Sequence, residues 1–532
     1  MAQVLTIGLD GATWDLLVPM AQAGRLPHLA KLMARGSWGD LRSTVPALTL
    51  PAWSSCITGR NPGGHGVFAF RRQSTADYGP GRLANAADLR APTVWDLAGQ
   101  GGKRVGVVNV PPSYPLRPVP GFIVGCLLTP PGAPFTAPLE VAGELGPYRI
   151  DVPAPRDLRR DAPDFESRAL GYLEALREQT VWRGEAVARV VAQRPVDLLM
   201  VVFYGPDRVQ HFFWADVKEG KGGPIHAAAL AVYSAMDDAV GRLVRAAGED
   251  ATVLVVSDHG FGDRPERAVH VNRWLADRGL LTRYPLWTLR RKVIRRLFPA
   301  RWRAHYDTID HIMVDRRRSR AWAGTIEPRT IGIWVHRRDQ YPLGTVSPGP
   351  EYEAIRDAIR TGLTALRDEA DRPVFTTVAR REDLYHGPFV EEAPDLVAVC
   401  TKPFGGVFNS LGRDLRAKTL FSPYTEAGYS GTHDPAGIYL FAGPLIRARG
   451  RGGELPIEAI APTTLHLLGL PVPKSFEAPV CTEVLEPDFL ARQPIRIVED
   501  EQGETDRGDG GWQSEGDETL IADHLRALGY LE

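Results

Sequence analysis

Short apolar runs alternate with helical periodicity along most of the chain. The apolar runs end at a polar residue or a glycine, which is the pattern of buried parallel strands. Between several of them, apolar positions recur at the spacing of an amphipathic helix. We predict strands over residues 4–9, 38–43, 104–110, 197–203, 252–257, 329–335, 395–400 and 437–442. We predict helices over residues 167–194, 225–247 and 351–369.

This alternation predicts the fold class and the domain organisation. Strands that alternate with helices indicate an α/β protein with a doubly wound, mostly parallel sheet flanked by helices. We expect one large catalytic core from residues 1–280 and 390–487, with an inserted cap or lid over residues 281–389. An acidic disordered linker over residues 488–519 and a C-terminal helix over residues 520–532 are expected to follow.

The overall charge excludes two kinds of protein. The chain has 63 Lys and Arg residues against 64 Asp and Glu residues, a net charge of −1. This balance excludes a globally basic nucleic-acid coat and an acidic solvating chain, so no nucleic-acid partner is expected. The four cysteines are far apart, which argues against a disulfide scaffold and a thiolate zinc site. With no leader and no membrane-spanning run, we expect a cytoplasmic protein.

One region departs from this balance. Residues 283–320 are strongly basic, and apolar positions from Leu289 to Phe298 recur at helical spacing. We expect a solvated basic helix that packs on the core through its apolar stripe. The alternatives are a lid over an anionic substrate and a peripheral membrane contact through residues 289–303.

Acidic residues and histidines stand beside several of the predicted strands, where active sites of doubly wound sheets lie. Two of them follow strand 197–203 at i, i+4 spacing, which places both on one face of a helix. Carboxylates and imidazoles are suitable ligands for zinc or a similar divalent ion. Singly, each has a plainer explanation as a helix cap, a turn residue or an isolated histidine. The set comprises Asp10, Asp207, His211, Asp258, His259 and His433.

A threonine-containing segment after strand 38–43 is a second candidate. Thr49 stands where a helix N-cap belongs, Pro51 suits the first helical turn, and Gly59 suits the helix end. The plain explanation is that Thr49 only caps the helix. The functional explanation uses the same position, because a helix N-terminus favours phosphate binding and a nearby metal activates a hydroxyl as a nucleophile.

Five blocks of sequence, in order, resemble the type I phosphodiesterase/nucleotide pyrophosphatase branch of the alkaline phosphatase superfamily, with its prokaryotic phosphohydrolase and phosphomutase relatives. The blocks are GLDG around Asp10, TLPAWSSCITGRNPGGHGV from Thr49, GPDRVQHFFW from Gly205, VVSDHGFG from Val255 and SGTHDPAGIYLFAGP from Ser430. The resemblance implies an alkaline phosphatase-like core and a metal-dependent phosphoric ester hydrolase.

The resemblance also implies a role for each candidate. Two divalent ions, usually zinc and sometimes manganese in the family, would lie about 4 Å apart. Thr49 would be the nucleophile that cleaves a phosphodiester or pyrophosphate of a small phosphorylated substrate through a phosphothreonine intermediate. Backbone N–H groups near residues 50 and 51 would stabilise the phosphoryl oxygens. The implied ligands are Asp10, Asp258 and His259 for one ion, and Asp207, His211 and His433 for the other.

The sequence departs from the family at two positions and leaves alternatives open. Where the family commonly carries an Asn that contacts a phosphoryl oxygen, we align Phe70, and the residue after Pro51 is Ala52 rather than Asn. The alternative functions are a phosphomutase or phosphotransferase with the basic insertion closing over the site, a phosphomonoesterase, and a non-enzymatic anion-binding protein. His270 is expected to be structural, with a place in the site as its alternative. The sequence predicts neither the natural substrate nor the oligomeric state.

Overall fold

The computed structural model describes residues 3–72, 81–155, 158–220, 222–284, 314–408, 410–425, 428–500, 515–528 and 530–531. The chain divides into two compact units, the first from residues 1–70, 84–263 and 428–531 and the second from residues 71–83 and 264–427. The basic helix expected over residues 289–298 and the acidic residues 501–514 lie outside the described residues. The domain limits expected from the sequence stay predictions.

The first unit is built around a large sheet. Its strands are β1 (Val4–Leu9), β2 (Gly36–Arg42), β3 (Val105–Val108), β4 (Gly121–Val124), β5 (Thr136–Ala137), β6 (Leu198–Phe203), β7 (Thr252–Val256), β17 (Ala436–Ala442), β18 (Gly450–Arg451) and β19 (Leu455–Pro456). Among the described residues their order is β18-β2-β17-β7-β1-β6-β3-β4-β5, with β19 also paired to β2. The central strands are parallel, whereas β17 runs antiparallel between β2 and β7. The predicted α/β class with a mostly parallel sheet is therefore confirmed.

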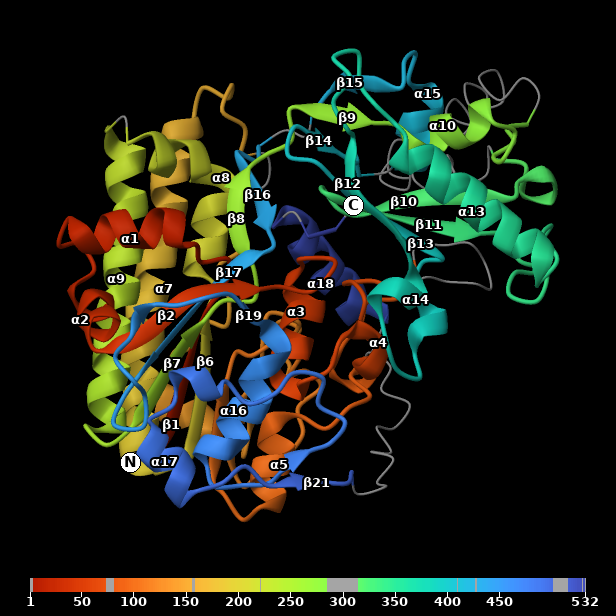
Figure 1. Ribbon diagram of the computed structural model, residues 1–532. Helices are drawn as coiled ribbons and strands as arrows, with labels where there is room; N and C mark the ends of the chain where they lie inside the picture. The colour runs from red at the N-terminus through yellow and green to blue at the C-terminus, as the bar shows by residue number, and fades with distance from the viewer. Residues whose placement is uncertain are drawn as a thin grey trace. The chain divides into compact units, whose positions relative to one another are not determined.

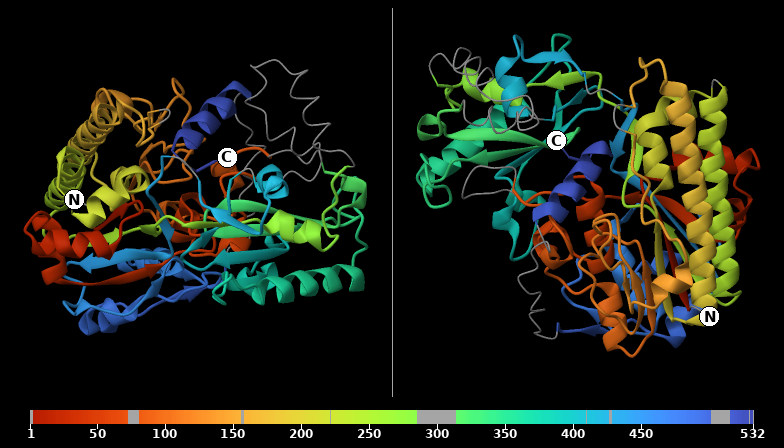
Figure 2. Two further views of the ribbon diagram at one scale, coloured as in Figure 1. Left: turned by 90° about the horizontal axis from the view of Figure 1, so that it is seen from above. Right: turned by 180° about the vertical axis from the view of Figure 1, so that it is seen from behind.

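Helices flank this sheet in two groups (Figures 1 and 2). The helices of this unit are α1 (Trp14–Gln22), α2 (Pro27–Ala34), α3 (Thr49–Thr58), α4 (Pro62–His65), α5 (Val94–Gln100), α6 (Val141–Leu145), α7 (Phe165–Gln193), α8 (Gly205–Glu219), α9 (Pro224–Ala247), α16 (Ile460–Leu467), α17 (Pro487–Arg492) and α18 (Glu515–Ala527). The long helices α7 and α9 lie side by side and α8 packs on α9, while α3, α5 and α16 pack with one another. Within the described part of the chain, no helix has the length and apolar character needed to cross a membrane.

Two short strand pairs complete the first unit. They are β8 (Gly260–Asp263) with β16 (Gly431–Asp434), and β20 (Val472–Pro473) with β21 (Ile497–Val498). The antiparallel register of β16 on β8 sets His433 opposite Phe261, two residues after His259. Two distant chain segments therefore bring two of the candidate histidines together.

The second unit has its own sheets and its own core. Its elements are β9 (Arg267–Val269), α10 (Val271–Asp277), β10 (Ala321–Glu327), β11 (Thr330–Val335), α13 (Pro350–Thr364), β12 (Phe375–Arg380), α14 (Arg381–Leu384), β13 (Leu396–Cys400), β14 (Phe404–Gly405), α15 (Ser410–Arg416) and β15 (Phe421–Pro423). The strands form an antiparallel sheet in the order β10-β11-β13-β12 and a small sheet in the order β14-β9-β15. Trp274, Ile333 and Ile359 are among the residues buried in its core.

Most predicted elements form within a few residues of their expected limits, with two differences. The helix predicted over residues 351–369 ends at Thr364. The strand predicted over residues 395–400 forms as β13, but it pairs with β11 and β12 rather than joining the large sheet. His270 belongs to this second unit, where its ring nitrogens lie 2.9 Å from Asp414 Oδ1 and 2.9 Å from Ser422 Oγ. These contacts support its structural interpretation.

Candidate metal centre

Three adjacent parallel strands deliver three carboxylates to one edge of the large sheet. β1 lies between β6 and β7, and all three run in the same direction. Asp10 directly follows β1, Asp207 lies in the first turn of the helix after β6, and Asp258 follows β7. All three side chains are fully buried. The convergence that the sequence pattern predicted therefore occurs at the carboxyl ends of the central strands.

Gly11 allows these loops to approach one another. Its φ of +68° lies in the left-handed region, and a Cβ there would lie 3.1 Å from the backbone of Asp207. Its amide donates to Asp258 Oδ1 at 3.2 Å. A larger residue directly after Asp10 would therefore be strained and would press on the backbone of Asp207.

Each carboxylate accepts hydrogen bonds on one oxygen only. The bonds run from Trp53 Nε1 to Asp10 Oδ2 (3.0 Å), from the Gly11 amide to Asp258 Oδ1 (3.2 Å), and from Arg208 Nη1 and the Tyr530 hydroxyl to Asp207 Oδ2 (2.7 and 2.6 Å). Among the described residues, none forms a hydrogen bond with the second oxygen of any of the three: Asp10 Oδ1, Asp207 Oδ1 or Asp258 Oδ2. Buried anionic oxygens without donors are costly, so this arrangement fits oxygens that bind cations.

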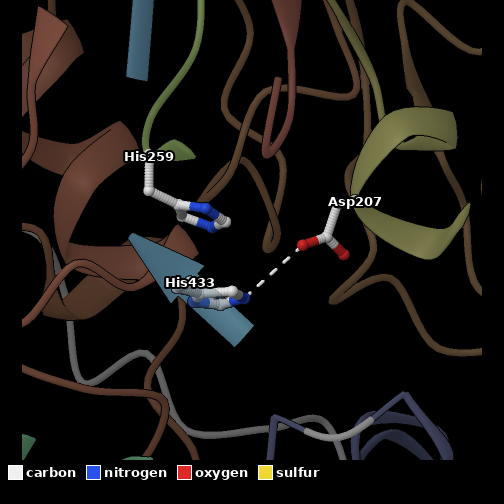
Figure 3. A group of neighbouring side chains, drawn as sticks. All are labelled: Asp207, His259 and His433. Atoms are coloured by element: carbon white, nitrogen blue, oxygen red, sulfur yellow. Dashed lines mark ion pairs between the residues drawn. The ribbon is translucent and has the colours of Figure 1, made fainter. Parts of the chain in front are cut away.

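The orientation of two of the histidines also suits metal binding. His259 Nδ1 lies 3.0 Å from the Gly260 carbonyl, and His433 Nδ1 lies 3.0 Å from the Ala47 carbonyl. Because a carbonyl only accepts, each Nδ1 carries the proton and each Nε2 presents a lone pair, the usual arrangement of metal-binding imidazoles. His433 Nε2 lies 3.5 Å from Asp207 Oδ1, and the rings of His259 and His433 are stacked (Figure 3).

The potential ligand atoms form two buried groups. In each of the groups Asp10, Asp258, His259 and Asp207, His259, His433, the ligand atoms lie within 4.8 Å of one another. His211 borders the second group, with its Nε2 3.3 Å from Asp207 Oδ1 and 3.1 Å from His433 Nε2. The six candidate ligands therefore converge in a site consistent with two metal ions. The division of ligands between the ions and the metal's identity stay predictions.

The electrostatics of the site also favour cations. Burial, followed by the charge of Asp207, raises the pKa of Asp10 well above its usual range, and burial together with Asp10 does the same for the pKa of Asp258. Burial also opposes ionisation of Asp207, but His211 and then Arg208 outweigh it and hold the pKa of Asp207 well below its usual range. Burial, and then His433, lowers the pKa of His259, which keeps that ring neutral. Divalent ions would relieve the repulsion between the carboxylates.

Thr49 lies beside this centre. It is fully buried, and its Oγ1 lies 3.3 Å from His259 Nε2. The N-cap is Leu48, so the prediction that Thr49 occupies the cap position is wrong by one residue. The amide of Ala52 bonds to the Leu48 carbonyl, and Pro51 has no N–H, so the expected donor at residue 51 is also wrong. Among the described residues, no backbone carbonyl accepts from the amides of Thr49 and Leu50, as is usual at a helix N-terminus.

A comparison with known protein families shows which family the chain belongs to. The family model for type I phosphodiesterase/nucleotide pyrophosphatase matches residues 4–405. The chain belongs to this family. The resemblance carried by the five blocks is therefore confirmed, and the chain is a phosphodiesterase/pyrophosphatase-family hydrolase that carries a buried candidate site for two metal ions.

Two solved structures share the fold of this family member. One is human ectonucleotide pyrophosphatase/phosphodiesterase 5, with 15% identity, coverage of 91% of this chain and 100% of that chain, and a TM-score of 0.51. The other is the phosphonoacetate hydrolase from Sinorhizobium meliloti 1021 in complex with phosphonoacetate, with 16% identity, coverage of 86% and 91%, and a TM-score of 0.52. At this identity the two likenesses establish the fold.

Three residues around the ligands were not found from the sequence. Trp53 holds Asp10, while Arg208 and Tyr530 hold Asp207. For Trp53 a signal was present, because it lies one helical turn after Thr49 and so shares its face. For Arg208 the weak signal was its adjacency to Asp207, which does not specify that its side chain turns toward that carboxylate. For Tyr530 the weak signal was a terminal apolar segment, which does not specify a contact with a residue more than 300 positions away.

Proposed function

We propose that the chain hydrolyses a phosphodiester or pyrophosphate bond in a small phosphorylated substrate, with Thr49 as the nucleophile and two divalent ions, preferably zinc, as cofactors. The observation that carries this proposal is the position of Thr49, whose Oγ1 lies 3.3 Å from His259 Nε2 in a fully buried site. The family membership supports the reaction class.

The chain's own residues supply the nucleophile and orient it. Thr49 Oγ1 forms a bond to phosphorus as the bond to the leaving oxygen breaks, which gives a phosphothreonine, and water then hydrolyses this ester and restores the hydroxyl. The Thr49 and Leu50 amides at the start of α3 donate to the phosphoryl oxygens. When bound, the two ions supply charge neutralisation at phosphorus and activation of the attacking oxygen.

The carboxylates and imidazoles would hold the ions. For this role Asp10 and Asp258 offer one free oxygen each, next to the Nε2 of His259. Asp207 offers its Oδ1 beside the Nε2 atoms of His211 and His433. Oxygen and imidazole nitrogen ligands without thiolate suit zinc, and also manganese.

Turnover of bis(p-nitrophenyl) phosphate tests the proposal. Wild-type activity should be abolished by a chelator and restored by Zn²⁺, and Thr49→Ala should lower kcat by at least ~10³-fold. Thr49→Ser should retain part of the activity because it keeps the hydroxyl. Acid quenching during turnover, followed by mass spectrometry, should locate a phosphate on the peptide that contains Thr49.

A matched control is available on the same helix. Thr58 is also buried in α3, but its hydroxyl donates to the Ser54 carbonyl and takes no part in the site. Thr58→Ala should therefore keep full activity per folded molecule. Undiminished turnover in Thr49→Ala, or in the double variant Asp258→Ala/His259→Ala, would contradict the proposal.

The alternative of a phosphomutase or phosphotransferase rested on the basic insertion. Most of that segment lies outside the described residues, so no described contact favours this alternative.

Product analysis separates hydrolysis from phosphoryl transfer. Hydrolysis gives a phosphomonoester or inorganic phosphate from water, whereas transfer gives a new phosphate ester in proportion to an added alcohol. A panel of p-nitrophenyl phosphate, phosphonoacetate and p-nitrophenyl sulfate beside the diester would define the preferred ester.

A further inference from the structure

The C-terminal end of the first unit reaches the metal centre. After α18 (dark blue in Figures 1 and 2), Tyr530 is buried, with 3% of its surface exposed. Its hydroxyl donates to Asp207 Oδ2 at 2.6 Å and accepts from Arg208 Nη1 at 2.6 Å. A residue more than 300 positions away in sequence therefore contacts a predicted metal ligand directly.

The oxygen that Tyr530 contacts determines what it can do. The other oxygen of Asp207, Oδ1, faces His211 Nε2 at 3.3 Å and His433 Nε2 at 3.5 Å and has no hydrogen-bond partner in the described part of the chain. The tyrosine hydroxyl thus does not compete for the metal-facing oxygen. It holds the opposite oxygen, which fixes the rotation of the carboxylate and leaves Oδ1 directed at the imidazoles.

The ring of Tyr530 is itself held in place. It stacks on Phe70, with ring centroids 4.8 Å apart and planes at 29°, and meets the ring of His211 edge-on at 5.6 Å. Phe70 is itself buried, so the contact lies within the packed interior. The stacking keeps the hydroxyl at one place even when its hydrogen bonds exchange.

A second connection from α18 reaches the same guanidinium. His524 Nε2 lies 3.3 Å from Asp151 Oδ2, and this oxygen accepts from Arg208 Nη2 at 2.6 Å. Arg208 is fully buried and donates its other nitrogen to Asp207 and to Tyr530. The end of the chain therefore positions both the carboxylate and the arginine beside it.

We propose that Tyr530, docked by α18, is a positioning residue of the metal centre that fixes Asp207 for binding one of the two ions. This inference rests on the proposed two-ion site and adds to it a contribution from the C-terminal segment. Neighbours that orient a metal ligand commonly change metal affinity by about 10–100-fold when removed. Loss of the Tyr530 hydroxyl should accordingly weaken one ion and leave the other.

Zinc titration of the metal-free full-length protein against a chromophoric chelator tests the inference. The wild type should bind two Zn²⁺ ions. In Tyr530→Phe, which keeps the ring, one dissociation constant should rise at least ~10-fold while the other is unchanged. The lost activity of this variant should return at excess Zn²⁺, because the nucleophile is intact. The matched control is Tyr439→Phe, which removes another buried tyrosine hydroxyl, bonded to the Gly453 carbonyl, and should leave both constants unchanged.

The outcomes distinguish the two proposals. A wild type that binds fewer than two Zn²⁺ ions would overturn the proposed function itself. A wild type with two ions and a Tyr530→Phe variant with identical affinities would overturn only the positioning role. Tyr530→Ala, which also removes the ring, should weaken zinc binding further; a higher kcat in this variant at saturating Zn²⁺ would show that the segment blocks the site instead.

Discussion

Trp53 donates its indole N–H to Asp10 Oδ2 at 3.0 Å, one helical turn after Thr49. The same face of α3 thus carries the proposed nucleophile and the residue that orients a ligand beside it. Trp53→Phe keeps most of the apolar volume but removes the only donor to Asp10 Oδ2 among the described residues. We expect zinc affinity to fall by about 10–100-fold and kcat to fall at limiting zinc, measured by chelator competition and diester turnover.

The control for this substitution is another tryptophan of the same unit. Trp14 Nε1 donates to the Gly39 carbonyl and not to a candidate ligand. Trp14→Phe should lower stability modestly without changing zinc affinity. Equal zinc affinities in the Trp53 and Trp14 variants would show that the Trp53 bond does not position Asp10.

Gly8 in β1 packs directly under Trp53. A Cβ at this position would lie 2.4 Å from the indole ring and 2.8 Å from Val202 Cγ2, so the ring must shift. Gly8→Ala should destabilise the protein by about 1–3 kcal/mol through overpacking and should also weaken zinc binding, since the displaced indole releases Asp10. Urea unfolding and zinc titration measure the two effects. Gly453→Ala is the control, because nothing lies within 4 Å of its added Cβ; similar losses in both variants would contradict the argument.

The buried carboxylates of the site should lower the stability of the metal-free protein. Burial and Asp10 raise the pKa of Asp258, so its charged form is disfavoured when no cation is bound. Asp258→Asn keeps the acceptor for the Gly11 amide and replaces the unpaired oxygen with an N–H donor that faces His259 Nε2. We expect this variant to be inactive but more stable than the wild type, by roughly 1 kcal/mol or more, in urea unfolding with EDTA at neutral pH.

A buried aspartate with satisfied oxygens provides the contrast. Asp237 accepts from the His28 and Leu29 amides on its two oxygens. Asp237→Asn removes one acceptor and should destabilise the metal-free protein. If Asp258→Asn is also less stable than the wild type in EDTA, the unpaired carboxylates are not a strain on the fold.

His65 should make stability depend on pH. Its Nδ1 accepts from the Val67 amide and its Nε2 donates to Ser55 Oγ, so the ring is neutral. Burial, with Arg60 and Arg90, lowers the pKa of His65 to about 3. The unfolded chain binds a proton near pH 6.5 and the folded chain does not until about pH 3, so the free energy of unfolding rises with pH between these values.

The expected slope from His65 is about 1.4 kcal/mol per pH unit between pH 6 and pH 4. Urea unfolding of the metal-free protein at several pH values measures it, with His65→Asn as the reference because that side chain does not titrate. Other groups contribute equally to both proteins and cancel in the difference. Parallel pH profiles for the two proteins would contradict a neutral buried His65.

The strands and the meeting of the candidate ligands at one sheet edge could be predicted because they depend on local patterns. The apolar runs that become β1, β6 and β7 are each followed by a polar residue, and parallel strands bring such residues to one edge. The sheet to which a strand belongs is not local. The run that forms β13 has the same apolar character as the core strands, yet it pairs within the second unit. Nothing within the run itself encodes its partner.

The residues that contact the candidate ligands could not be predicted from the sequence, for a related reason. Tyr530, Arg208 and Asp151 meet only after α18 docks, and such contacts have no period or spacing in sequence. The exact start of α3 depended on one hydrogen bond, between the Ala52 amide and the Leu48 carbonyl, which shifted the cap by one residue. Thr49 nonetheless lies at the start of the helix, where the pattern placed it.

The order of strands in the large sheet has a consequence for the point in synthesis and folding at which the site is complete. Its central strands β1, β6 and β7 come from early and middle parts of the chain, whereas β16, which contributes His433, comes from a late part. The stretch from β1 to β8 carries every candidate ligand except His433. A nascent polypeptide that ends before β16 would therefore lack one ligand of the centre, and full hydrolytic capacity should arise only when β16 pairs with β8.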